Sequence, residues 1–221
     1  MVQLILASQS PRRRRLIERI GHTARVLVTD VDEGSVDDPD PASNVVRTAL
    51  LKAEAAAEEA SQGLILAADT TVALDGEMLG KPAHDTQAIH TLTRLRGRVH
   101  QVHTGLVILE TESGQVETAV CTTDVFMRLY TNEEIAAYID SGDPFDKAGA
   151  YAIQNRTFHP VERIDGCYTN VVGLPLCRVV ALLRRFGFAS SLPVAEASCD
   201  YRSCATCLKL MAEDGVESLA S

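Results

Sequence analysis

The sequence has no tryptophan, and aromatic residues make up only 5% of its 221 residues. Single-stranded nucleic acids are usually bound on aromatic stacking platforms, so such a platform is not expected here. A basic excess is also missing, because the formal net charge is -9, and this argues against a general nucleic-acid-binding protein.

Long apolar runs are missing as well. No run approaches the roughly 18 apolar residues that a membrane-spanning helix needs. The apolar segment Met1–Ala7 is too short for the hydrophobic region of a secretion signal, and its arginines follow it instead of preceding it. We therefore predict a cytoplasmic protein that binds neither nucleic acid nor a membrane.

Three common catalytic signatures are absent from the sequence. No glycine-rich loop ends in Gly-Lys-Ser/Thr, which disfavours a P-loop nucleotide hydrolase. The sequence also contains no His-Glu-x-x-His zinc helix and no Gly-x-Ser-x-Gly nucleophile turn. Any catalytic chemistry must therefore come from a different arrangement of residues.

The order of expected elements predicts an α/β fold. A buried strand at Val2–Ala7 leads into a helix, and Leu64–Ala68 forms a strand that ends at Asp69. Strands at 102–109 and 116–129 follow each other as a hairpin-like pair. Strands and helices alternate early and the paired strands come later, which predicts a mixed β-sheet with flanking helices that can form two lobes.

We assign residues 1–188 to this domain and expect 189–221 to form a poorly ordered tail, because the composition there becomes small and polar. Cys199, Cys204 and Cys207 in this tail include one zinc-like spacing, but a structural zinc site usually has four ligands. Reduced thiols without a dedicated role, a metal site shared with a partner and a regulatory disulfide all stay open.

The segment from Ser8 to Arg13 is a candidate anion site. A strand runs into a helix start, where Ser10 suits the N-cap and Pro11 the first helical position. Free backbone N–H groups at a helix start attract anions, and arginines add bidentate contacts to phosphate. Arg13 shares the inward face of the helix, whereas the alternative is a solvated basic turn.

Asp69 is the candidate catalytic acid or base. A carboxylate at the carboxyl end of a buried strand lies at the ligand crevice of α/β sheets. There it can hold a cation or accept a proton from water. The alternative is an aspartate that begins a turn or caps a helix.

Further charged residues are candidates of lower specificity. Lys52 lies on the inward edge of an expected helix, and Lys81 follows Gly80 in a proline-stiffened turn. Either lysine could reach a phosphate or simply be a surface charge. The nearby histidines His100 and His103 could bind a metal, but hydrogen-bonded strand residues are the favoured interpretation.

These residues resemble the Maf family of nucleotide pyrophosphatases over about residues 2–188. The matching segments, in the family's order and spacing, are Leu6-Ala-Ser-Gln-Ser-Pro-Arg-Arg13, Ala68-Asp-Thr70, Leu79-Gly-Lys-Pro82, Gly97-Arg-Val-His100 with Thr104-Gly105, and Asp143-Pro-Phe-Asp-Lys-Ala-Gly-Ala-Tyr-Ala-Ile-Gln154. The resemblance implies a fold like that of inosine triphosphatases, with two lobes around a cleft. It also implies a homodimer and a divalent metal, Mg²⁺ or alternatively Mn²⁺.

The resemblance also implies roles for individual residues. Asp69 matches the family's proton acceptor and, with Glu33, would hold the metal. Arg12, Thr70 and Gln154 match positions that set substrate choice. The remaining matches are cleft residues that would bind the substrate, and they are Ser8, Arg13, Lys52 and Lys81.

Within the family, the segment Gly166–Pro175 looks like the branch that hydrolyses dTTP and UTP to the monophosphate and pyrophosphate. Modified pyrimidine nucleotides are further candidate substrates. Hydrolysis of 7-methyl-GTP and a nucleotide-binding regulatory role linked to cell division are the alternatives. Gln9 and Arg156 depart from residues that are common in the family, which puts the details of the nearby loops in question.

Overall fold

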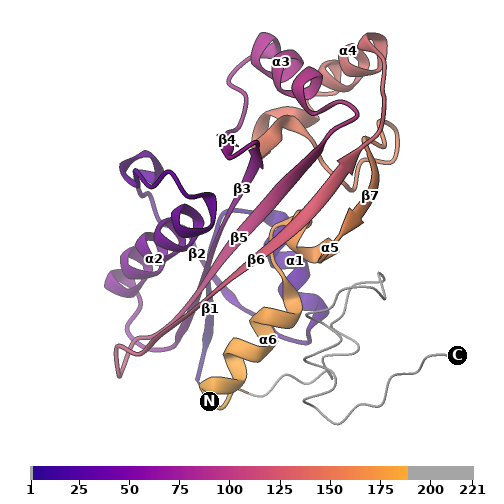
Figure 1. The fold of residues 1–221 in the computed structure, drawn as a ribbon. Coiled ribbons are helices and arrows are strands. Elements are labelled where there is room, and N and C mark those ends of the chain that lie inside the picture. Colours follow the sequence, from indigo (N-terminus) through magenta and orange to yellow (C-terminus); the bar gives the residue numbers. More distant parts are fainter. Residues whose placement is uncertain (1, 189–221) are drawn as a thin grey trace, which may run out of the picture.

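A computed structural model describes residues 2–188 of the chain, and Figure 1 shows its fold. The strands are β1 (Leu4–Ala7), β2 (Arg25–Leu27), β3 (Leu64–Leu74), β4 (Glu77–Leu79), β5 (Val99–Glu110), β6 (Val116–Met127) and β7 (Val161–Asp165). The α-helices are α1 (Pro11–Arg19), α2 (Pro41–Glu59), α3 (Asp85–Leu95), α4 (Asn132–Asp140), α5 (Tyr168–Val172) and α6 (Leu176–Arg185), and the 3₁₀ turns are Glu33–Ser35, Asp143–Asp146 and Ala148–Ala150.

Two sequence predictions concern residues outside this range. The tail at 189–221 and its cysteines Cys199, Cys204 and Cys207 lie outside the described residues.

Among the helices of residues 2–188, none is long and apolar enough to cross a membrane.

The seven strands form one mixed sheet, which confirms the predicted fold class. The strand order is β2-β1-β3-β5-β6-β7, and β4 pairs with β3 beside that path. β1 pairs in parallel with β2 and with β3, whereas the remaining pairs are antiparallel. The long β3, β5 and β6 run side by side through the middle of the molecule (Figure 1).

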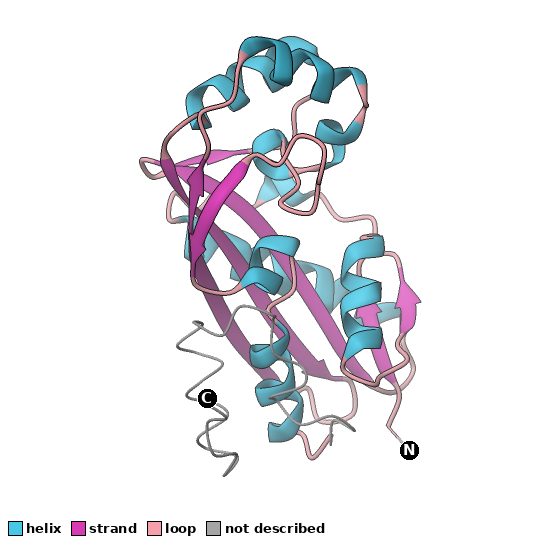
Figure 2. Cartoon of the chain, turned by 90° about the vertical axis from the view of Figure 1, so that its right-hand side faces the viewer, coloured by secondary structure: helices cyan, strands magenta, loops and turns pink. Residues whose placement is uncertain are grey.

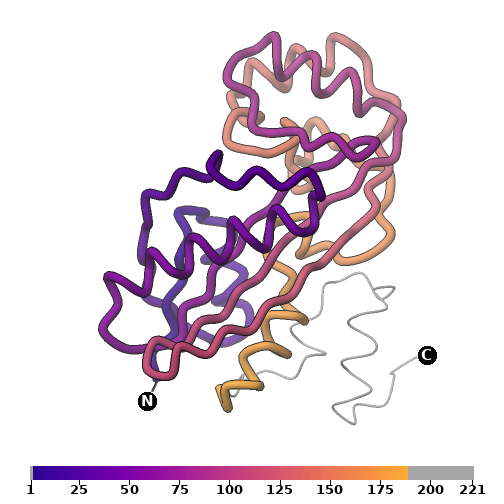
Figure 3. The backbone as a smooth tube through the Cα atoms, turned by 60° about the vertical axis from the view of Figure 1, so that its left-hand side comes forward, coloured from indigo at the N-terminus to yellow at the C-terminus, as the bar shows by residue number. Residues whose placement is uncertain are grey.

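Helices cover both faces of the sheet. α2 packs its alanine-rich face on one side, against β1, β3 and β5. On the other side, α1 and α6 pack on one end of the sheet, and α3 and α4 pack on the other end. We name the group formed by α1 and α6 alone the α1–α6 lobe, and the group formed by α3 and α4 the α3–α4 lobe. Figure 2 shows their helices spaced along the sheet, and Figure 3 brings α2 forward on the opposite face.

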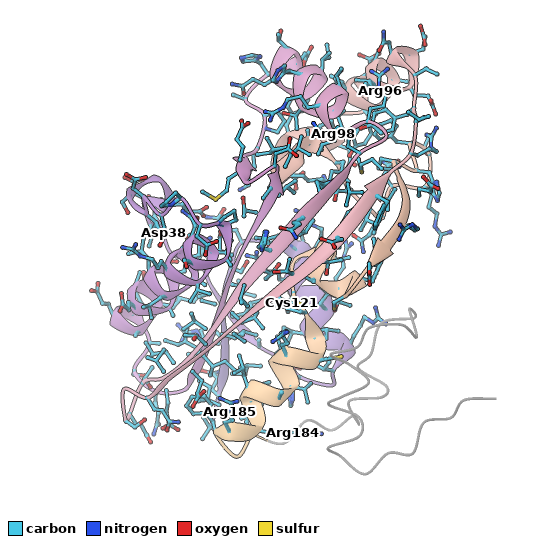
Figure 4. The ribbon with its side chains drawn as sticks, viewed as in Figure 1. Asp38, Arg96, Arg98, Cys121, Arg184 and Arg185 are labelled. Atoms are coloured by element: carbon cyan, nitrogen blue, oxygen red, sulfur yellow. The ribbon has the colours of Figure 1, made fainter. Side chains whose placement is uncertain are left out.

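The α1–α6 lobe follows the sequence prediction closely. The Ser10 side chain accepts a hydrogen bond from the Arg13 backbone N–H at the start of α1, and Pro11 is the first helical residue. Leu16 and Ile17 face the core as the helical period predicts. Cys121 of β6, labelled in Figure 4, is buried in the same core.

The prediction that a strand ends at Ala68 is wrong, because β3 continues to Leu74 and Asp69 lies in its interior. β5 pairs with β3 from Leu64 to Ala73, and this antiparallel ladder keeps the polar segment extended. On its other edge, β3 pairs with β1 only as far as Ala67 and with β4 only from Val72. None of the described strands pairs with this edge at residues 68–71, so the sheet has a gap there.

Gly105 lets α2 approach the sheet beside this gap. It pairs with Asp69 in the neighbouring strand. A Cβ atom at Gly105 would overlap the backbone of Val45 and Val46 in α2. The missing side chain therefore allows α2 to lie close to β3 and β5, with Lys52 two helical turns farther along.

Candidate active site

A cleft of about 620 Å³ lies at the gap in the sheet edge. Its walls come from the start of α1, the loop before α2, the middle of β3, and the segment from Asp146 to Gln154. The structure brings all of the sequence-predicted site residues to this cleft: Ser8, Arg12, Arg13, Glu33, Lys52, Asp69, Thr70, Lys81 and Gln154. The cleft therefore unites residues that are far apart in the sequence.

Asp69 and Thr70 point to opposite faces of the sheet, since side chains alternate along a strand. Asp69 faces α2, where it meets Lys52, whereas Thr70 faces α1, where it meets Arg13. Because the sheet edge is open here, the cleft reaches both side chains. The sequence analysis assigned both Asp69 and Thr70 to one site. It did not predict that they line opposite sides of the cleft.

On the α2 side, two carboxylates converge on one ammonium. Lys52 Nζ lies 2.6 Å from Asp69 Oδ1 and 3.0 Å from Glu33 Oε1. The Lys52 side chain is only 11% exposed. Burial acts to raise the pKa of the Glu33 carboxyl, but Lys52 and Lys81 outweigh it and hold this pKa below its usual range.

On the α1 side, Arg13 joins three segments of the chain through two backbone carbonyls and two side-chain hydroxyls. Its Nε donates to Gly173 O at 2.8 Å, and its Nη1 donates to Ala68 O at 2.8 Å and to Ser8 Oγ. Its Nη2 donates to Thr70 Oγ1 at 2.9 Å. Arg13 therefore holds the floor of the cleft together, and Ala68 lies on the unpaired edge of β3. Sequence reasoning missed this bracing role.

Arg12 reaches across the cleft from α1 to the opposite wall. Its Nη1 donates to Asp146 Oδ2 at 3.0 Å. Asp146 also pairs with Lys147, whose ammonium contacts Asp143 at 3.0 Å. Asp143 in turn accepts a hydrogen bond from Asn155, beside Gln154. A series of polar contacts thus connects Arg12 to the loop that carries Gln154. The one sequence signal for these contacts is the Asp146-Lys147 pair within the matching segment.

Lys81 and Gln154 lie at exposed positions on the cleft wall. The turn before Lys81 is tied to the opposite segment, because Gly149 N–H donates to Gly80 O at 3.2 Å. Gln9, a departure from the family pattern, also lines the cleft and is exposed. The cleft therefore has a fixed floor and a more accessible rim.

The two histidines of β5 do not form a pair. His100 and His103 are an odd number of residues apart and face opposite sides of the strand. His100 Nε2 lies 2.7 Å from the Tyr151 hydroxyl, and His103 Nδ1 lies 3.0 Å from Thr122 Oγ1. Burial lowers the pKa of His100 to about 3, so its ring is neutral.

Glu33 and Asp69 fit a divalent cation that is shared with a bound ligand. The Lys52 ammonium contacts one oxygen of each carboxylate. The two oxygens therefore lie no farther apart than the sum of those two contact distances. Among residues 2–188, no group of three or more His, Cys, Asp or Glu side chains could hold a metal alone. Mg²⁺ is commonly held by one or two carboxylates together with substrate phosphates and water, which is the arrangement these residues allow.

This geometry defines an α/β protein with a cleft in which arginines and lysines surround the two carboxylates Glu33 and Asp69. The model of the Maf family, described as Maf-like protein, matches residues 3–186. The chain therefore belongs to the Maf family.

Relatives of known name are similar over most of the chain. A dTTP/UTP pyrophosphatase of Dehalococcoides mccartyi is 45% identical over 193 residues, 86% of this chain and 85% of that protein. A dTTP/UTP pyrophosphatase of Dictyoglomus turgidum is 45% identical over 188 residues, 85% of this chain and 97% of that protein. Among solved structures, the Ham1 protein of Staphylococcus aureus matches with a TM-score of 0.42 and 18% identity, covering 57% of this chain and 71% of that one.

Proposed function

We propose that this protein hydrolyses dTTP and UTP, and modified pyrimidine nucleoside triphosphates, to the monophosphate and pyrophosphate. One observation carries the proposal: Asp69 and Glu33 meet in a single cleft with Arg12, Lys52 and Lys81. A triphosphate needs positive charge along its length, and a hydrolytic step needs an acceptor for the proton of water. The names of the relatives support the choice of dTTP and UTP.

In the proposed reaction, a water oxygen attacks the α-phosphorus and its proton passes to Asp69. The bond between the α-phosphorus and the bridging oxygen breaks, and pyrophosphate leaves with that oxygen. Arg12, Lys52 and Lys81 bind the phosphate oxygens and stabilise the charge that develops on the leaving group. Arg13 keeps the floor in place through its contacts with Ala68 O and its other acceptors.

Glu33 and Asp69 would hold the divalent cation, which we propose to be Mg²⁺, with Mn²⁺ as the alternative. When bound, the cation supplies Lewis acidity to the phosphate oxygens. The carboxylates would supply oxygen ligands to the cation, and the substrate phosphates would supply others.

Arg12, Thr70 and Gln154 are the proposed residues for substrate choice. The Thr70 hydroxyl lies 2.9 Å from Arg13 Nη2 and 2.9 Å from Thr104 Oγ1. Both contacts fix its position, so Thr70 would act on the substrate largely through the shape of the floor. Arg12 and Gln154 lie on facing walls and are available to read the nucleotide directly.

The homodimer, the cytoplasmic location and the absence of nucleic-acid or membrane partners stay predictions. The assignment of residues 1–188 as one catalytic domain is part of the same proposal. Size-exclusion chromatography with light scattering would test the dimer.

A substrate panel tests the function. Pyrophosphate release is measured from dTTP, UTP, CTP, ATP, GTP and 7-methyl-GTP, with Mg²⁺, with Mn²⁺ and with EDTA. We expect metal-dependent turnover led by dTTP and UTP. Turnover led by 7-methyl-GTP would keep the mechanism and change the substrate, whereas binding of nucleotides without turnover would favour a regulatory protein.

A further inference from the structure

Lys52 lies in the place between Glu33 and Asp69 that the divalent cation needs. Its ammonium contacts Asp69 Oδ1 at 2.6 Å and Glu33 Oε1 at 3.0 Å, and its side chain is 11% exposed. A cation held by both carboxylates would therefore meet an ammonium that is already between them. Two positive charges at such short range repel strongly, and water screens this repulsion poorly on the inner side, where Lys52 and Asp69 are 11% and 16% exposed, whereas Glu33 at the outer side is 53% exposed.

We propose that Lys52 is an internal cation that holds the two carboxylates together in the metal-free cleft and moves to the substrate phosphates when metal binds. Lys52 is anchored on α2, and a lysine has a flexible four-carbon stem with a compact charge at its end. The ammonium can therefore change partners while α2 stays in place. This inference rests on the proposed function, because it takes a divalent cation and a phosphate ligand as the partners.

A consequence is that metal and nucleotide assist each other's binding. Metal alone must break both ion pairs of Lys52 and leaves the ammonium without an anionic partner. A triphosphate in the cleft provides that partner, so the cost of displacing Lys52 is offset when both ligands are present. Two ligands that favour the same rearrangement bind with positive coupling, commonly about 5- to 150-fold. Lys52 thereby acts as the positioning residue that links the two ligands.

The test measures Mn²⁺ binding to the full chain by electron paramagnetic resonance, without nucleotide and without turnover. Lys52→Met removes the internal cation, and Lys81→Met removes the same charge from the same cleft without touching Asp69. Lys52→Arg keeps a positive charge at the position. We expect Lys52→Met to bind Mn²⁺ at least about tenfold more tightly than the wild type, a value within the range of coupling between sites. Lys81→Met should change the affinity by less than about threefold because it removes only a more distant repulsion.

Lys52→Arg should bind Mn²⁺ as weakly as the wild type. Circular dichroism melting of each variant, with and without Mn²⁺, checks that the chain is folded. If Lys52→Met melts too low for the assay, Lys52→Gln replaces it with the same expectation. Folded Lys52→Met, or folded Lys52→Gln in its place, that binds Mn²⁺ no more tightly than Lys81→Met overturns the inference. If the inference about Lys52 fails but the substrate panel still shows metal-dependent turnover, the proposed function stands. If the wild type and all variants neither bind Mn²⁺ nor turn over any nucleotide, both the inference and the proposed function are overturned.

Discussion

Asp69→Asn should lower kcat for dTTP by about 10²- to 10⁴-fold, the usual contribution of a positioned proton acceptor. The amide has nearly the same shape as the carboxylate, but it cannot accept the proton of the attacking water. It also removes one negative charge beside Lys52, which contacts Asp69 Oδ1 at 2.6 Å. Because Asp69 would also hold the metal, binding of an uncleavable α,β-imido analogue is compared without metal, where it should survive. Steady-state turnover and calorimetric titration of the analogue measure the two effects separately.

Asp75→Asn is the matched control. Asp75 lies in the turn after the same strand, where its carboxylate pairs with Arg98 at 2.7 Å on the surface. Its backbone has a φ of 54°, a conformation that asparagine also tolerates. Turnover of this variant should match the wild type. Near-normal turnover of Asp69→Asn would instead show that another group accepts the proton.

Arg13→Met should lower the free energy of unfolding by about 3 kcal/mol, because buried acceptors left without a donor cost about 1–3 kcal/mol each and some can recruit water. Arg13 has four acceptors, of which Ser8 Oγ keeps the Ser10 N–H and Thr70 Oγ1 keeps Thr104 Oγ1, so Ala68 O and Gly173 O are the two that lose their donor. The melting temperature should fall by roughly 2–4 °C per kcal/mol for a chain of this size. Urea unfolding monitored by circular dichroism measures the change.

Arg14→Met is the control for this experiment. Arg14 is the next residue of α1, with a side chain that is 67% exposed and paired only weakly with Glu18 at 3.4 Å. Its loss should change stability by less than about 0.5 kcal/mol. Arg13→Lys should behave more like Arg13→Met, since one ammonium cannot reproduce the fork of a guanidinium. Equal stability of the two methionine variants would contradict the bracing role of Arg13.

Local chemistry made α1 and the cleft membership predictable. Ser10 and Pro11 carry the signals of a helix start, and Leu16 and Ile17 repeat at the helical period. Arginines at a helix start indicate an anion site, and all the residues that carry this signal are adjacent in the chain. The family motifs then identified the distant members, and the structure brings them to one cleft.

The partners of these residues were not predictable in the same way. The strand through Asp69 continues because β5, which comes later in the chain, pairs with it from Leu64 to Ala73, and no local signal at Asp69-Thr70 reports that ladder. The same limit applies to Lys52 and Arg13. Their inward positions followed from helical spacing, but the carboxylates and carbonyls that they bind come from other elements.

The most direct measurement of the central claim is dTTP hydrolysis in water enriched in ¹⁸O, with mass spectrometry of both products. Attack of water on the α-phosphorus beside Asp69 predicts that the label enters the thymidine monophosphate and that the pyrophosphate stays unlabelled. Label in the pyrophosphate would place the attack on the β-phosphorus and would contradict this account of the cleft.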